Sequence, residues 1–206
     1  MLWLVFSVVL ASAVGYFVTD LLEPPLPVGS VSVLVTTLNS DEGLGAVQTL
    51  VTNRSTGDTS RGPILATFQW NSGSHPLWVR APRALWIFEL ETSDGPTVWR
   101  VSDTTGAVLQ TAKVPPLARP LLAADATGLY IAGAGSFGGV RDTLIVHLGI
   151  GASHAVTILN TAPRNANSEL VSSIDLQGST VVANVCVRPL TDPQPCHLWR
   201  YHERTT

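Results

Sequence analysis

Residues 84–101 read Ala-Leu-Trp-Ile-Phe-Glu-Leu-Glu, then Thr-Ser-Asp-Gly-Pro, then Thr-Val-Trp-Arg-Val, and this stretch decides the fold. Two runs rich in aromatic and β-branched residues flank a turn that contains Asp, Gly and Pro, so the pattern predicts a β-hairpin. The first run is apolar at every position from 84 to 88. Such a run is typical of a strand covered on both faces, because a half-exposed strand alternates with polar residues.

A similar pattern recurs along the chain. Residues 76–88 align without a gap on 120–132, a shift of 44 positions, and the second strand at 97–101 aligns on 143–147, a shift of 46. Shorter matches extend the series to four copies, which cover residues 49–57, 76–101, 120–147 and 180–201. Units of about 45 residues, each built of short strands, are the sequence signature of β-propeller blades.

The hairpin after this stretch carries Trp99-Arg-Val-Ser-Asp-Thr-Thr-Gly106, in which Asp and Gly suit the turn. At these residues the chain resembles the bacterial YVTN and virginiamycin-B-lyase-like propellers, whose blades carry a similar Trp-Arg-Val-(Ser/Asp)-x-x-Thr-Gly hairpin. The resemblance covers residues 64–160 and implies a β-propeller fold. The lyase of that family uses acid–base residues and a magnesium ion. None of these is matched here, so the resemblance implies no catalytic residue and no cofactor for this chain.

We therefore predict an all-β fold, namely a β-propeller-like array of about four blades, small or incomplete, preceded by one N-terminal hydrophobic helix. The last copy has no fourth strand, so a strand at 31–38 could complete that sheet and close the array. Without such closure the array is an open arc with exposed apolar end faces. The alternative fold is a β-sandwich, which needs similar strands but no repeat. Residues 44–51 come nearest to a helical pattern after residue 30.

Residues 1–22 are predicted to form a transmembrane anchor. Residues 2–18 carry no charge and are almost wholly apolar. As a helix at about 1.5 Å per residue they span roughly 25 Å, near the lower limit of a bilayer crossing. A cleaved signal peptide, suggested by Ala11-Ser-Ala13, and a buried element are the alternatives. Because the first cation is Arg54, we expect a single-pass membrane protein with an extracytoplasmic domain, or a secreted protein if the signal is cleaved.

The remaining chain divides at a proline-rich stretch. Residues 23–30 contain three prolines within four positions and predict a stiff linker, so residues 31–206 are assigned to the folded domain.

The formal net charge is −3, and the cations are scattered singly, with Lys113 as the single lysine. No basic stripe follows the chain, so we expect no nucleic-acid partner.

Cys186 and Cys196 are the two cysteines, and each lies at the turn-side end of a predicted strand of one hairpin. Opposed positions on paired strands bring Cβ atoms within the roughly 3.5 to 4.5 Å that a disulfide requires. We predict a disulfide if the domain is exported, with two buried thiols as the alternative. Metal binding by Cys196 and His197 lacks further ligands.

Two other patterns carry little chemistry. Gly133-Ala-Gly-Ser-Phe-Gly138 matches the dinucleotide-binding glycine pattern, but a strand-like run follows it, so we expect a flexible loop and no nucleotide site. The five histidines show no metal-ligand spacing, so no metal is expected.

Four tryptophans on predicted strands are assigned to the core: Trp78, Trp86, Trp99 and Trp199. Trp70, beside Asn-Ser-Gly-Ser, is the candidate for ligand contact.

These features give three functional hypotheses. The first is a membrane-tethered extracytoplasmic binding or scaffold domain without catalysis, whose loops recognise a partner protein or a surface ligand. The second is a propeller enzyme of lyase or hydrolase type, which requires residues such as Glu89, Asp125, His147 and Asp175 to converge in one channel. The third is a vestigial structural fragment. The sequence favours the first and assigns no catalytic residue.

Overall fold

The computed structural model describes residues 29–39, 43–69, 76–90, 92, 95–137, 140–161, 169–187 and 196–202. These residues form strands, turns and connections with no helix among them, so the all-β prediction is confirmed for the described part of the chain. The predicted helix at 1–22 and most of the predicted linker lie outside the described residues.

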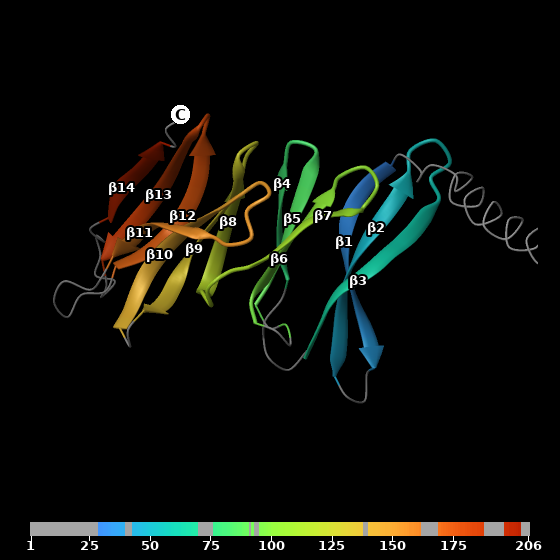
Figure 1. The fold of residues 1–206 in the computed structure, drawn as a ribbon, viewed down its shortest axis with the longest axis horizontal. Coiled ribbons are helices and arrows are strands. Elements are labelled where there is room, and N and C mark those ends of the chain that lie inside the picture. Colours follow the sequence, from blue (N-terminus) through green and yellow to red (C-terminus); the bar gives the residue numbers. More distant parts are fainter. Residues whose placement is uncertain are drawn as a thin grey trace, which may run out of the picture.

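The described strands form four antiparallel sheets, named A to D in chain order (Figure 1). Sheet A holds β1 (Gly29–Asn39), β2 (Leu44–Asn53) and β3 (Thr59–Gln69). Sheet B holds β4 (Leu77–Ala81), β5 (Ala84–Glu89), β6 (Thr97–Ser102) and β7 (Val108–Lys113). Sheet C holds β8 (Ala118–Ala124), β9 (Gly128–Phe137), β10 (Val140–Gly149) and β11 (Val156–Thr161). Sheet D holds β12 (Glu169–Gln177), β13 (Thr180–Val187) and β14 (Cys196–His202). Each sheet pairs strands in the order of the chain.

The sheets stack face to face, from sheet A at one end to sheet D at the other (Figure 1). Between A and B, Val47 and Phe68 pack with Ile87. Between C and D, Ile145 packs with Val185. Sheets B and C are therefore covered on both faces, which explains why β5 and β9 are apolar at consecutive positions.

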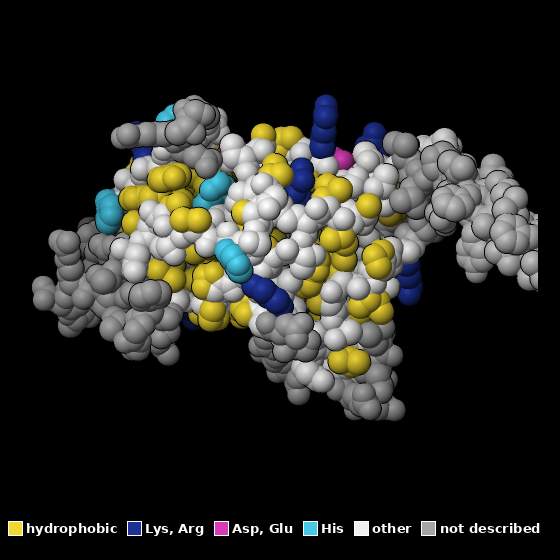
Figure 2. Space-filling view, in the orientation of Figure 1, with side chains coloured by type: hydrophobic (Ala, Val, Ile, Leu, Met, Phe, Trp, Pro, Cys, Tyr) yellow, Lys and Arg dark blue, Asp and Glu magenta, His cyan; other side chains and the backbone are white. Residues whose placement is uncertain are grey.

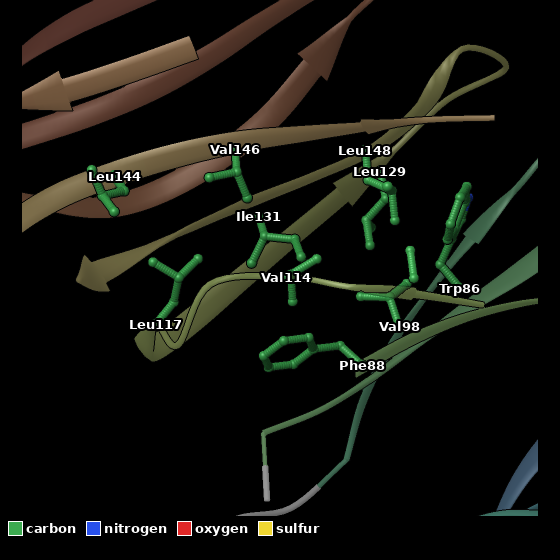
Figure 3. Packing of buried hydrophobic residues seen from close by; sticks show 11 residues of the cluster. Trp86, Phe88, Val98, Val114, Leu117, Leu129, Ile131, Leu144, Val146 and Leu148 are labelled. Carbon is green, nitrogen blue, oxygen red and sulfur yellow. The ribbon is translucent and has the colours of Figure 1, made fainter. Parts of the chain in front are cut away.

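The interface between sheets B and C holds the largest buried cluster (Figure 3). Trp86 and Phe88 project from β5 toward Ile131 on β9 and toward Val146 and Leu148 on β10, and each of the five is at most 1% exposed. Burial of one such side chain stabilises a fold by about 1.5 to 3 kcal/mol. This interface forms the centre of the array.

Two turns have the same geometry and relate sheet A to sheet B. In the β2–β3 turn, Gly57 N donates to Asn53 O at 2.9 Å, and in the β6–β7 turn Gly106 N donates to Ser102 O at 3.0 Å. Both glycines have positive φ, of 76° and 71°, which a residue with a side chain rarely adopts. Strands β2 and β3 therefore correspond to β6 and β7, the third and fourth strands of sheet B.

The hairpin registers relate the other sheets in the same way. Ala81 pairs with Ala84 in sheet B, and Gln177 pairs with Thr180 in sheet D, so β12–β13 corresponds to β4–β5. Among the described residues, sheet A contains counterparts of strands two to four, and sheet D contains counterparts of strands one to three. Sheets B and C contain all four.

One alignment made from the sequence is wrong by a residue. The shift of 46 places Trp99 on Ile145, but Trp99 faces sheet A, the preceding sheet, whereas Ile145 faces sheet D, the following sheet. Val146 packs toward sheet B, the preceding sheet, so it is the counterpart of Trp99 and the shift is 47. A slip of one residue matters because successive side chains in a strand point to opposite faces.

Other expectations also need correction. The strand at 31–38 does not complete the last sheet, because β1 pairs with β2 at the opposite end of the array. Residues 44–51 form strand β2. Residues 133–137 of the glycine pattern continue strand β9 instead of forming a loop. The glycines leave space for neighbours, since a Cβ on Gly135 would lie 2.5 Å from Leu144 Cδ1.

Trp78 is the one predicted core tryptophan that is largely exposed, with 52% of its surface accessible. It lies on β4, opposite Ile87, and so faces sheet A. No counterpart of a first strand is present in the described part of sheet A, so nothing in that sheet covers Trp78. Trp86 and Trp99 are buried and Trp199 is partly buried, as the sequence predicted.

Candidate functional site

A cleft of about 460 Å³ lies between β3 of sheet A and β6–β7 of sheet B. Its lining consists of nine described residues: Ile64, Leu65, Ala66, Thr67, Thr92, Thr97, Trp99, Thr111 and Lys113. Five of the nine are threonine or alanine, whose small side chains leave space between the two sheets. It combines apolar contacts, hydroxyl groups and one cation.

Hydroxyl groups and the only lysine gather at one end of the cleft. Lys113 Nζ donates a hydrogen bond to Thr97 Oγ1 at 2.8 Å, and Thr97 Oγ1 donates to Gly95 O, also at 2.8 Å. Thr92 Oγ1 donates to the same carbonyl and lies 3.2 Å from Thr97 Oγ1. Gly95, with φ of 88°, makes the tight turn that allows this convergence. The threonines therefore hold the ammonium group at the end of the cleft.

The sheet register explains why these groups meet. Glu89, Thr97 and Lys113 form one row across β5, β6 and β7. In the neighbouring row Trp99 pairs with Thr111, so all four β6 and β7 residues of the lining share one face of sheet B. Glu89 is fully buried on that face, and Trp99 is 7% exposed. The Glu89 carboxyl group and the Lys113 ammonium group therefore lie on the same face of sheet B, the first buried and the second lining the cleft.

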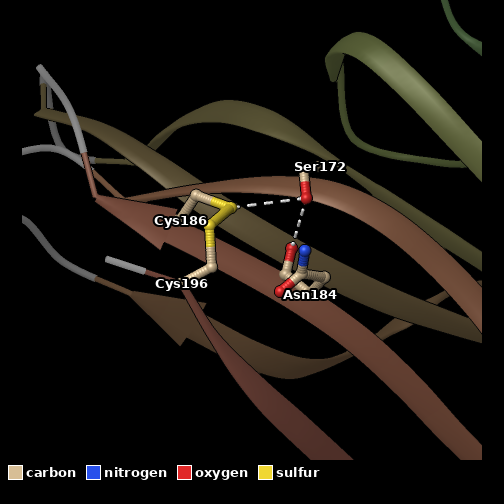
Figure 4. Close-up of a disulfide and its surroundings, with 4 residues drawn as sticks. All are labelled: Ser172, Asn184, Cys186 and Cys196. Atoms are coloured by element: carbon tan, nitrogen blue, oxygen red, sulfur yellow. Dashed lines mark hydrogen bonds between the residues drawn. A yellow bond between two sulfur atoms is a disulfide. The ribbon is translucent and has the colours of Figure 1, made fainter. Parts of the chain in front are cut away.

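The predicted disulfide is confirmed (Figure 4). Cys186 and Cys196 are directly opposite on β13 and β14, and their Cα atoms are 4.1 Å apart. Cys186 Sγ also lies 3.5 Å from Ser172 Oγ, whose hydroxyl donates to Asn184 O (Figure 4). The disulfide joins the edge strand of sheet D to its neighbour.

The four residues proposed for an enzyme channel lie apart. Glu89 faces sheet A from sheet B, whereas His147 faces sheet D from sheet C. Asp175 is exposed on the outer face of sheet D, opposite Val182. Asp125 Oδ1 accepts hydrogen bonds from the amides of Thr127 and Gly128 at 2.7 and 3.1 Å and so stabilises a turn.

The other candidates have ordinary structural positions or lie outside the described residues. His147 is 9% exposed and stacks on Tyr130, with ring centroids 4.4 Å apart. Within the described ranges no three His, Cys, Asp or Glu side chains are grouped in a way that could hold a metal ion. No helix among the described residues is long and apolar enough to cross a bilayer. Trp70 lies outside them.

Comparison with known proteins gives no family for this chain. No family model, no curated protein and no solved structure matches it. The resemblance to YVTN and lyase-like propellers therefore stays a prediction. Sequence reasoning missed the cleft because its two walls come from residues 64–67 and 92–113, which belong to different sheets. The available signal was the uniqueness of Lys113, which lies two residues after Thr111 on the same face of a predicted strand.

Proposed function

We propose that this protein is a membrane-anchored, extracytoplasmic, propeller-like binding domain that captures a small ligand in the cleft between β3 and β6–β7. The observation that carries the proposal is the convergence of Lys113 with Thr92 and Thr97 at one end of a 460 Å³ cleft. An ammonium group and hydroxyls bind carboxylates and other oxygen-rich groups. The apolar wall at Ile64 and Trp99 suits the carbon skeleton of the same ligand.

The propeller part of the proposal rests on the repeated registers and turns. The sheets are meanders stacked in chain order, and the first strands β4, β8 and β12 lie next to one another. Blades of a propeller share both properties. In this proposal the array is open, with sheets A and D at its ends.

The extracytoplasmic location is supported by the Cys186–Cys196 disulfide, since disulfides persist in oxidising compartments. Residues 1–22 would hold the domain at the membrane. Membrane fractionation of cells that produce the full chain, followed by protease treatment from outside, tests this part. We expect the protein in the membrane fraction and its domain accessible to the protease. A protein found in the culture medium supports the secreted alternative, and a soluble cytoplasmic protein contradicts both.

The ligand class is tested with a matched pair of sugars, glucuronate and glucose, in which only glucuronate carries a carboxylate. Because Lys113 is the single lysine, selective ¹³C labelling of lysine gives one Cε signal that reports on the cleft. We expect this signal to shift with glucuronate and not with glucose. Lys113→Met should weaken glucuronate binding about tenfold or more, because it removes a charge-assisted hydrogen bond.

Arg54→Met provides the control, since Arg54 is an exposed cation in the β2–β3 turn and does not line the cleft. This variant should bind glucuronate as the parent does. A lysine signal that shifts with neither sugar, or equally with both, contradicts the proposed site.

For the alternative of an enzyme, no arrangement among the described residues gives specific support.

A further inference from the structure

Strand β14 (Cys196–His202) occupies the third position of its sheet but is an edge strand. In sheets B and C the third strands, β6 and β10, each pair with a fourth strand, β7 and β11. In the described part of sheet D, β14 pairs with β13 alone. The sequence of β14 still suits an inner strand, because Leu198, Trp199 and Tyr201 follow one another closely. The edge of β14 is thus a template for a further strand, and no described segment of the chain occupies it.

The backbone of β14 offers a regular row of hydrogen-bonding groups at this edge. The Cα atoms of Cys186 and Cys196 are 4.1 Å apart, which fits the closer, non-hydrogen-bonded type of antiparallel pair. The two types alternate along a strand, so Cys196, Leu198, Arg200 and His202 direct their N–H and C=O groups away from β13. No hydrogen bond joins these groups to another described segment.

The last strands of the other three sheets, β3, β7 and β11, pair irregularly with their neighbours, and β14 does not. Register shifts interrupt the pairing of β3, β7 and β11 with their neighbours, and β3 also contains Pro63. In contrast, β14 pairs with β13 at seven consecutive positions without a shift. Bulges and prolines protect edge strands, whereas a regular edge with exposed apolar residues accepts further strands. Leu198 on β14 is 61% exposed.

The surface beside this edge is also apolar. Val156 on β11 is 66% exposed and lies opposite His147, on the side of sheet C that faces sheet D. Trp199 and Tyr201 stack on the facing side of β14, with ring centroids 5.9 Å apart. Figure 2 shows hydrophobic side chains gathered over this end of the molecule. A fourth strand on sheet D would cover both the aromatic pair and Val156.

We propose that β14 is a docking site for an extended segment of a partner protein, which adds to sheet D as an antiparallel fourth strand. The chain's own fourth strands indicate the chemistry of this segment. Val-Leu-Gln-Thr-Ala-Lys in β7 and Val-Thr-Ile-Leu-Asn-Thr in β11 are six residues long, contain two and four β-branched residues, and carry at most one charge. Main-chain hydrogen bonds supply the affinity in this mode of recognition, and alternate side chains supply the specificity.

The geometry favours a partner segment over a second copy of this chain. Two β14 strands paired antiparallel would be related by a two-fold axis perpendicular to the sheet, which leaves both C sheets on the same side. The C sheet of the second copy would then meet β10 and β11 of the first, which already occupy that space. An isolated extended segment brings no such sheet. This docking site is separate from the cleft between sheets A and B, and Lys113→Met should not affect it.

Amide hydrogen exchange of the full chain tests the proposal, with a synthetic peptide containing Val-Thr-Ile-Leu-Asn-Thr as the probe. We expect the peptide to slow exchange about tenfold at the outward-pointing amides of Leu198 and Arg200, while those of Trp199 and Tyr201 are slow throughout. A peptide N-methylated at alternate residues is the control, because it cannot complete the ladder. It should leave the exchange unchanged.

Leu198→Pro removes one outward N–H without touching the ladder to β13, since proline is tolerated at strand edges. This variant should lose the peptide response, and Leu198→Thr, which keeps the N–H, should retain it. If Leu198→Pro fails to fold, the N-methylated peptide decides alone. Equal responses to both peptides overturn the proposal. Slow exchange of the Leu198 amide without peptide also overturns the proposal. If that slow exchange depends on protein concentration, the occupant of the edge is a second copy of the chain.

Discussion

The two end sheets of this molecule differ in how their open edges are treated. In sheet A the start of the edge strand β1 is covered by sheet B, because Gly29 N donates to Thr104 O at 2.8 Å and Val31 N donates to Asp103 O at 3.1 Å. Arg80 Nη2 donates to Val31 O at 2.8 Å. In sheet D no described segment makes such contacts with β14.

The difference shows that a missing strand has different consequences at the two ends of a stacked array. Sheet A is followed by sheet B, whose β6–β7 turn and Arg80 reach back over the start of β1. No sheet follows D among the described residues, so its edge keeps unpartnered backbone groups. A strand edge that a neighbouring segment covers cannot pair with a further strand, whereas an open edge can. The following predictions test this contrast, from the largest effect to the smallest.

Replacement of two equivalent tryptophans should separate the two ends most clearly. Trp99→Ala removes a side chain that is 7% exposed between sheets A and B, and we expect it to lower the free energy of unfolding by about 3 to 5 kcal/mol. Trp199→Ala removes the partly buried counterpart on β14, at a cost of about 1 to 2 kcal/mol. Denaturant unfolding measures both. Equal losses would mean that β14 is as well covered as β6.

Removal of the disulfide should affect sheet D alone. The double variant Cys186→Ala, Cys196→Ala opens a loop closed over a separation of 10 residues, which in the chain-entropy model costs about 2 to 3 kcal/mol. Amide exchange should become faster in β13 and β14 and stay unchanged in β1. Faster exchange in β1 as well would show that the two ends unfold together.

Two glycines in turns form a matched pair. Gly106→Ala places a Cβ 2.9 Å from Val51 Cγ2 at a φ of 71°, so strain and crowding together should cost about 2 kcal/mol. Gly178→Ala, at a φ of 63°, meets no atom within 4 Å and should cost about 1 kcal/mol from strain alone. Thermal unfolding compares the two variants. A larger loss at Gly178 would contradict the contact between the β6–β7 turn and sheet A.

Loss of the Arg80 contact should open the edge of β1 with a small effect on stability. Arg80→Met leaves the Val31 carbonyl without this donor, and because Arg80 is exposed we expect a loss of about 1 kcal/mol or less. Amide exchange at the start of β1 should become faster. Arg61→Met, an exposed cation on β3, is the control and should change stability by less than about 0.5 kcal/mol. Identical exchange in the two variants would show that Arg80 does not close this edge.

Most strands were predictable because their patterns are local. The hairpin at 84–101 became β5 and β6, and the copy at 180–201 contains β13 and most of β14. The disulfide followed from the same logic, since two cysteines on one hairpin face each other if the strands pair. Strand β12 was missed, because Ser172, Ser173 and Asp175 interrupt its apolar pattern. These polar residues do not prevent β12 from pairing with β13.

The candidate cleft and the β14 edge were not predictable in this way. The cleft needs Ile64 and Lys113 on facing sheets, and their order along the chain gives no sign of that proximity. The edge of β14 is open because no described segment pairs with it. A sequence pattern describes how a strand is built and not which segment lies beside it.

The amino-acid sequence alone determined the strands, the hairpins and the approximate repeat, because aromatic and β-branched runs separated by glycine, proline and asparagine act over a few residues. Tertiary structure decided which face of each strand packs against which neighbouring sheet, and which strand edges are covered. An alignment does not distinguish a shift of 46 residues from a shift of 47. Side chains alternate between the two faces of a strand, so the packing of the sheets identifies Val146, and not Ile145, as the counterpart of Trp99. The closure of β1 by Arg80, 49 positions away, likewise depends on how the sheets stack.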